Sequence, residues 1–115
     1  MSTESAPGPV RLCARDDLAP GEARCFVVEG RRVALARLGE EFFAVDDTCS
    51  HADFSLSEGD VDVDECALEC PAHGSLFDLR TGEALTLPAV VPVATHGVVI
   101  SDEGVFVTLR ERWRA

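Results

Sequence analysis

Two short clusters of cysteine and histidine constrain this chain more than any other feature. The first cluster reads Cys49-Ser50-His51 and the second reads Cys70-Pro71-Ala72-His73. The stretch around the first cluster has no clear helical or strand period, and the second cluster follows a short alternating run. We therefore expect two separate loops, each of which presents one thiolate and one imidazole.

Thiolates and neutral imidazoles bind borderline and soft metals, so these four side chains fit either one zinc ion or the two irons of a [2Fe–2S] cluster. For any one of them alone, a buried thiol or a core histidine would be the simpler interpretation. The joint spacing argues against that interpretation. Each loop contributes a mixed pair, and the C-x-H spacing is shorter than the spacing usual for zinc fingers and knuckles. Both features favour the iron–sulfur cluster over zinc.

The sequence from Cys70 to Asp78, followed by Thr81-Gly82, resembles the C-P-x-H-G-x-x-F-D-x-x-T-G run of bacterial Rieske ferredoxins. The resemblance extends from Val10 to about Leu109. It implies that Cys49 and Cys70 hold one iron of a Rieske-type [2Fe–2S] cluster, and that His51 and His73 hold the other. It also implies that a proline-containing loop packs over the cluster, with Pro88 as the best match and Pro92 as the second.

The residues beside the ligands indicate which kind of Rieske protein this is. Respiratory Rieske proteins carry a disulfide between their two ligand loops, and the corresponding positions here are Phe54 and Ala72. Ser75 matches a serine that donates a hydrogen bond to the cluster in high-potential relatives, whereas Phe77 replaces a tyrosine that does the same. Acidic surroundings also disfavour an added electron. We therefore expect a reduction potential near the bottom of the Rieske range, which spans about −150 to +300 mV.

The remaining sequence predicts an all-β fold, because short alternating runs are separated by Gly, Pro and Asp and no helical period is present. We expect one domain over residues 10–110, an antiparallel β base like a sandwich or barrel. Residues 48–90 would form a small inserted cluster-binding subdomain, as the Rieske resemblance also implies. Residues 1–9 are expected to be a disordered tail and residues 111–115 a C-terminal tail. The expected strands are Val10–Ala14, Ala23–Val28, Arg32–Arg37, Phe42–Asp46, Glu65–Cys70, Leu76–Leu79, Gly97–Ser101 and Val105–Leu109.

Several residues are expected to be structural. The candidates for the base core are Phe26, Val27, Leu35, Phe42, Phe43, Val98, Ile100 and Phe106. On a regular strand Cys66 would share a face with Cys70 at about 13 Å, too far to bind the same cluster, so we expect a buried thiol. Cys13 and Cys25 are expected to pack in the base, and His96 to have a structural or surface role. Trp113 is either a packing anchor or a partner contact.

The charge distribution limits the partners. The net charge is −11, and residues 40–78 contain twelve acidic residues and no Lys or Arg. Such a chain should not bind nucleic acid or anionic membranes, but it can be steered towards a basic protein partner. No apolar run approaches the roughly 20 residues of a membrane span, and no signal peptide is recognisable. We expect a cytoplasmic, soluble monomer.

The expected function is electron transfer rather than catalysis. A chain of 115 residues leaves no room for a catalytic domain beside the cluster domain. All three of its His residues are already accounted for, so none is left to form a 2-His-1-carboxylate iron site. The resemblance implies a carrier between a basic-surfaced reductase and a terminal oxygenase, typically an aromatic-ring dioxygenase. Three alternatives remain: a carrier for iron–sulfur cluster assembly or another redox pathway, a nitrite-reductase small subunit, and a zinc-bound structural module.

Overall fold

The computed structural model describes residues 9–49, 54–72, 74–87 and 89–110. His51, His73, Pro88 and Trp113 lie outside these residues, as do the N-terminal segment 1–8 and the C-terminal segment 111–115.

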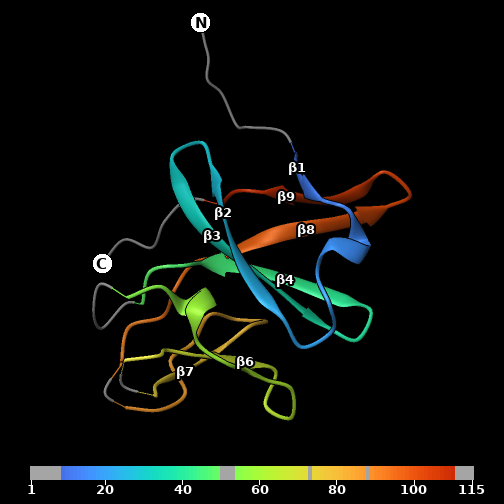
Figure 1. Ribbon diagram of the computed structural model, residues 1–115. Coiled ribbons are helices and arrows are strands. Elements are labelled where there is room, and N and C mark those ends of the chain that lie inside the picture. The colour runs from blue at the N-terminus through green and yellow to red at the C-terminus, as the bar shows by residue number, and fades with distance from the viewer. Residues whose placement is uncertain (1–8, 50–53, 73, 88, 111–115) are drawn as a thin grey trace, which may run out of the picture.

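Six antiparallel strands form the base of the molecule. Their order is β1-β9-β8-β4-β3-β2, and Figure 1 shows them curling into a nearly closed barrel. The strands are β1 (Val10–Cys13), β2 (Ala23–Val28), β3 (Arg31–Leu38), β4 (Glu41–Asp46), β8 (Thr95–Ser101) and β9 (Gly104–Thr108). Hairpins connect β2 to β3, β3 to β4, and β8 to β9.

A second, three-stranded sheet lies between β4 and β8 in the sequence and below the barrel in Figure 1. It consists of β5 (Val61–Asp62), β6 (Ala67–Glu69) and β7 (Leu76–Asp78), all antiparallel. Two 3₁₀ turns, η2 (Arg15–Asp17) and η3 (Leu56–Glu58), complete the described elements. The all-β, antiparallel prediction is confirmed, whereas the proposed limits 10–110 and 48–90 stay predictions.

Strand β3 explains how the two sheets fit together, because both of its faces are buried. Val33 and Leu35 point into the barrel core, while Ala34 and Ala36 belong to a second core between the barrel and the small sheet. Side chains alternate between the two faces of a strand, so this division follows directly from the order of residues. The small alanines leave a flat outer face on which the small sheet can pack.

The predicted strand Glu65–Cys70 is wrong at its beginning. Cys66 has a φ of 52° and lies in the turn before β6, so the alternation that linked it to Cys70 does not apply. Cys66 is nevertheless buried, at 4% exposure, in the same core as Cys70. Burial raises the pKa of its thiol, which keeps it protonated at neutral pH. The prediction of a buried thiol is therefore confirmed, and Cys13 is likewise buried in the base core.

Two residues expected in the base core are exposed. Val27 is 70% exposed because it shares the outer face of β2 and β3 with Arg32, beyond the part of that face that the small sheet covers. Ile100 is 37% exposed near the tip of the β8–β9 hairpin. Leu35 and Phe42 lie in the core as expected, with Phe26 and Val98 packed against it.

Gly59 allows the chain after η3 to approach the end of β6 closely. A Cβ atom at this position would lie 1.7 Å from the backbone oxygen of Glu69 and 3.2 Å from Pro71. We expect Gly59→Ala to lower the free energy of unfolding by about 2 kcal/mol or more, because backbone atoms must shift to make room. Urea denaturation measures the loss.

Gly97→Ala is the matched control. Its Cβ would find Thr108 at 3.8 Å, an ordinary contact, so its stability should change by less than about 0.5 kcal/mol. Equal losses in the two variants would contradict this account of Gly59.

Candidate functional site

The loop that carries Cys49 begins at Asp47 and is closed by hydrogen bonds at its base. The Cys49 N–H donates to the Phe54 carbonyl at 2.9 Å, and Thr48 and Ser55 form an isolated β-bridge. The Leu56 N–H donates to the Asp47 carbonyl at 2.6 Å. Cys49 is therefore held at a closed loop base, whereas His51 lies outside the described residues.

Asp47 organises this loop base, although the sequence argument gave it no role. It is completely buried, and its carboxylate accepts hydrogen bonds from the Ser57 N–H and the Ser55 hydroxyl. Arg32 forms an ion pair with it at 3.3 Å. The signal that could have found it was its position two residues before Cys49, within the span from Val10 to about Leu109 that resembles Rieske ferredoxins.

The loop that carries Cys70 connects β6 to β7 and is a tight turn. The Cys70 N–H donates to the Ser75 carbonyl at 2.8 Å, and the Gly74 N–H donates to the Cys70 carbonyl at 2.9 Å. Gly74 has a φ of 76°, a left-handed conformation that favours glycine. The glycine of the motif is thus a requirement of the turn. His73 itself lies outside the described residues.

The two loops bring Cys49 and Cys70 into one apolar core. Their exposures are 3% and 0%, and both pack in the cluster that includes Leu56, Phe77 and Ala89. Two thiols from separate loops in a shared apolar environment suit the cysteine-bound iron of a Rieske cluster. Within the described ranges, no three His, Cys, Asp or Glu side chains gather as a metal site. The fit of the described residues therefore rests on the two thiols.

A third loop packs against the Cys70 loop. The buried hydroxyl of Ser75 accepts a hydrogen bond from the Ala89 N–H at 3.1 Å. The Leu76 N–H donates to the Thr86 hydroxyl at 2.8 Å, and the Leu85 N–H donates to the Leu76 carbonyl at 2.7 Å. The loop expected to cover the cluster therefore lies beside the second ligand loop, although Pro88 is outside the described residues.

The F-D-x-x-T-G part of the motif has a structural explanation. Phe77 is completely buried in the core that holds both cysteines. The Asp78 carboxylate accepts hydrogen bonds from the N–H groups of Arg80 and Thr81, and the Gly82 N–H donates to the Asp78 carbonyl. These residues close the turn after β7 and so hold the second ligand loop from its far side.

His96 lies on β8 in a buried network with Asp46, the last residue of β4. Its Nδ1 accepts a hydrogen bond from the Arg110 N–H at 3.0 Å, so its Nε2 carries the proton that it donates to Asp46 at 2.9 Å. Arg31 forms an ion pair with the same carboxylate at 3.0 Å. Burial raises the pKa of Asp46, but the His96 hydrogen bond and the Arg31 charge outweigh it and hold the pKa below its ordinary value.

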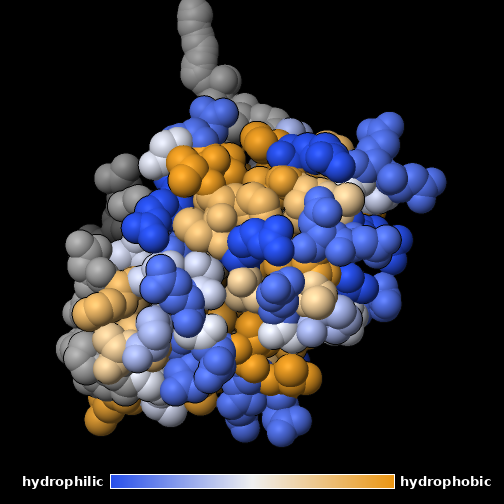
Figure 2. All heavy atoms as spheres, viewed as in Figure 1, coloured by the Kyte–Doolittle hydropathy of each residue, from blue (hydrophilic) through white to orange (hydrophobic). Residues whose placement is uncertain are grey.

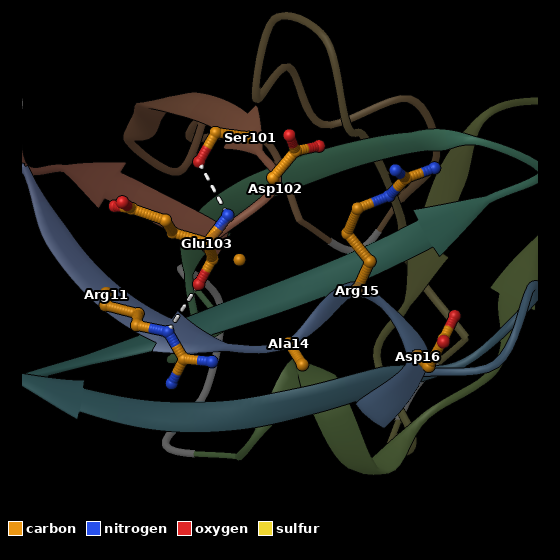
Figure 3. A pocket seen from close by; sticks show the side chains of 8 residues that line it. Arg11, Ala14, Arg15, Asp16, Ser101, Asp102 and Glu103 are labelled. Carbon is orange, nitrogen blue, oxygen red and sulfur yellow. Dashed lines mark hydrogen bonds between the residues drawn. The ribbon is translucent and has the colours of Figure 1, made fainter.

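A polar hollow of about 380 Å³ lies beside β1 and the β8–β9 hairpin and contains neither cysteine of the ligand loops. Figure 3 shows Arg11 and Arg15 around it, together with Asp16, Asp102 and Glu103. The Arg11 guanidinium donates to the Glu103 carbonyl at 2.8 Å. The residues that line this hollow carry charges of both signs and include no thiol or imidazole. The two cysteine loops therefore remain the candidate site.

The family model for the Rieske [2Fe-2S] domain matches residues 8–97. The chain therefore belongs to the Rieske [2Fe-2S] domain family, whose members bind a Rieske-type [2Fe–2S] cluster. Within the described ranges, no helix combines the length and apolar character that a bilayer crossing needs.

Within this family the chain is similar to ferredoxins of dioxygenase systems. It is 43% identical over 99 residues to the ferredoxin component of biphenyl 2,3-dioxygenase from Rhodococcus jostii (strain RHA1), covering 86% of this chain and 91% of that protein. The ferredoxin of carbazole 1,9a-dioxygenase from Nocardioides aromaticivorans IC177 superposes with a TM-score of 0.87 at 36% identity. That match covers 90% of this chain and 100% of the other.

Two further structures bear on partners and on the alternatives. A complex of reduced oxygenase and oxidized ferredoxin in carbazole 1,9a-dioxygenase matches with a TM-score of 0.81 at 37% identity, over 87% of this chain and 92% of that chain. A protein described as an NADH-dependent nitrite reductase small subunit from Mycobacterium tuberculosis matches with a TM-score of 0.79 at 26% identity, over 90% and 96%. The fold is thus shared by both classes, and the higher identity is with the ferredoxins.

The Asp46 network makes the stability of the chain depend on pH. Because the folded-state pKa of Asp46 lies below the ordinary value of about 3.9, its charge stabilises the fold above that pH. This contribution is lost as pH falls through the lower, folded-state pKa. We expect the free energy of unfolding to fall more steeply from pH 5 to pH 3 in the wild type than in Asp46→Asn.

At pH 7 the Asp46→Asn variant should be less stable by about 1–3 kcal/mol, because it loses a charged hydrogen-bond acceptor. Urea denaturation followed by circular dichroism at a series of pH values measures both effects. Parallel pH dependences in the two proteins would show that Asp46 does not have the lowered pKa.

Proposed function

We propose that this chain is a one-electron carrier that passes electrons from a reductase to a terminal oxygenase. The observation that carries the proposal is the burial of Cys49 and Cys70 in one core, on two loops of a Rieske-family chain. The similarity to dioxygenase ferredoxins covers most of the length of those proteins. The chain itself then oxidises no substrate, and we infer that it acts in the cytoplasm as a monomer.

In this proposal Cys49 and Cys70 bind one iron, and His51 and His73 bind the other. When bound, the cluster accepts and releases one electron. The apolar core around both cysteines keeps water away from the sulfur ligands. The Ser75 hydroxyl accepts from Ala89, so its own hydrogen remains for a bond towards the cluster, while Phe77 offers no hydroxyl. Pro88 belongs to the loop that covers this side.

Exposed apolar side chains lie on the first ligand loop and on the loop that is hydrogen-bonded to the second, and they favour a protein partner at this end. They come from the first ligand loop and from the loop after β7, and we call them the apolar collar: Phe54, Leu85, Leu87, Val90 and Val91. Leu87 and Val90 are more than 70% exposed. In Figure 2, hydrophobic atoms border the grey residues at the lower left of the molecule. Exposed apolar groups close to a redox centre are suited to transient docking.

Acidic side chains outside the collar indicate the charge of the partner. Glu58, Asp60, Asp64 and Glu65 are exposed on η3 and around β5, near the ligand loops in the sequence. No Lys or Arg interrupts residues 40–78. We infer that the reductase and the oxygenase each present an apolar patch with a basic rim, which would speed association at low salt.

A redox titration followed by EPR tests the cofactor proposal. The purified chain should be red-brown and give a rhombic signal on reduction, with a midpoint potential near the bottom of the range of about −150 to +300 mV. Ser75→Ala should lower that potential further, because a hydrogen bond that stabilises the reduced cluster is lost. A colourless protein that contains stoichiometric zinc would refute the carrier function.

Electron delivery to a terminal oxygenase tests the apolar collar. We expect Leu87→Asp to slow reduction of an aromatic-ring dioxygenase by about tenfold, because a charge replaces an apolar contact in the docking surface. Val99→Asp is the matched control. Val99 is 56% exposed on β8, so this variant adds the same charge at an exposed position outside the collar. Stopped-flow reduction measures both rates, and midpoint potentials measured alongside exclude a change in driving force.

Equal rates for the two variants would show that the collar is not the docking surface. A wild-type chain that reduces no oxygenase but reduces iron–sulfur assembly proteins would favour the assembly alternative. A stable complex with a nitrite reductase large subunit would favour the small-subunit alternative instead.

A further inference from the structure

We propose that Asp47 and Arg32 form a positioning pair that fixes the first ligand loop on the barrel and thereby sets the geometry of the bound cluster. The proposal rests on the proposed role of Cys49 and His51 as ligands. Neither Asp47 nor Arg32 is a ligand, so their effect would pass through the loop that they hold.

Asp47 contacts both sides of the loop base at once. On the barrel side, its N–H donates to the Arg32 carbonyl at 3.0 Å, and its carboxylate pairs with the Arg32 guanidinium at 3.3 Å. On the loop side, the same carboxylate accepts from the Ser57 N–H at 2.9 Å and from the Ser55 hydroxyl. Its carbonyl accepts from the Leu56 N–H at 2.6 Å. One residue thus joins β3 to the returning arm of the loop.

The burial of Asp47 gives these contacts their strength. A completely buried carboxylate is stable only when donors satisfy its oxygens, and here Ser55, Ser57 and Arg32 do so. Loss of a serine donor would leave a carboxylate oxygen with fewer hydrogen bonds, and loss of Arg32 would remove the charge that partners the carboxylate. The arrangement of the loop base is therefore strongly determined, and Cys49 follows Asp47 by only two residues.

Arg32 links this base to a third strand. Burial raises the pKa of the Cys25 thiol on β2, and the nearby Arg32 guanidinium acts in the opposite direction. The guanidinium pairs with the loop base, while the backbone of Arg32 belongs to β3 and pairs with Val27 of β2. About half of the Arg32 side chain is exposed, so it can be replaced with less damage than Asp47.

The neighbouring residues supply an internal comparison. Successive side chains of a strand point to opposite faces, so Arg31 and Asp46 form their own ion pair on the other side of the sheet, with His96. The distances are similar, 3.0 Å for Arg31–Asp46 and 3.3 Å for Arg32–Asp47. Of the two pairs, the second is the one whose carboxylate contacts Ser55 and Ser57. Two adjacent acid–base pairs therefore have different expected roles.

The experiment compares Asp47→Asn, Arg32→Gln and Asp46→Asn as purified, cluster-loaded proteins. The readouts are the EPR g-values of the reduced cluster and the rate of cluster loss to an excess of chelator. The midpoint potential is not a suitable readout, since removal of a nearby negative charge raises it whatever happens to the geometry.

We expect Asp47→Asn to shift the g-values and to lose its cluster at least tenfold faster, as is typical when a residue that supports a metal ligand is removed. Arg32→Gln should change both readouts in the same direction but less, because the serine donors remain. Asp46→Asn should keep wild-type g-values and the wild-type rate of cluster loss, although its unfolding is easier.

The proposal is overturned if Asp47→Asn and Arg32→Gln both keep wild-type spectra and rates, or if Asp46→Asn changes them equally. If Asp47→Asn does not fold, the comparison of Arg32→Gln with Asp46→Asn decides. Failure of the proposed ligand set would look different, because the wild-type chain would then give no Rieske signal. Failure of the proposed partner would leave that signal intact but give no electron delivery to an oxygenase.

Discussion

The packing of the small sheet on the outer face of β3 is the constraint on which the rest of the structure depends. Ala34 and Ala36 give that face no bulk, so a second layer can approach a strand whose inner face already belongs to the barrel core. A larger side chain at either position would have to be accommodated by movement of the whole small sheet. The core formed in this way contains Cys49 and Cys70. Barrel and ligand loops are therefore joined by packing before any metal is considered.

This arrangement gives the ligand loops two different parts: bases that are fixed by hydrogen bonds, and exposed side chains that can contact partners. Both loop bases are hydrogen-bonded, through the buried Asp47 on one side and through the partly exposed Asp78 on the other. The collar side chains around them remain exposed. A redox carrier needs both properties, because a stiff cluster environment limits reorganisation and an exposed apolar rim permits brief contact. Such contacts are weak and salt-dependent where charges contribute to them.

The sequence predicted most of what alternation and motif spacing determine. The barrel strands and the turn residues follow from local patterns, and the family follows from the two loops. Cys66 is buried as expected, but in a turn and not on the strand that the alternation predicted. The pattern did not predict that Val27 would be exposed, because its exposure depends on how far a distant sheet reaches across the strand. The role of Asp47 was missed for a related reason. Its partners lie 8 to 15 positions away, and acidic residues are usually solvated.

Nitrogen couplings to the reduced cluster, measured by pulsed EPR, test the central claim most directly. The proposed ligand set predicts two histidine nitrogens on one iron in the wild type and one in His73→Cys, with the Rieske-type spectrum lost in the variant. A wild-type cluster without nitrogen couplings would contradict the account, as would an unchanged spectrum in His73→Cys.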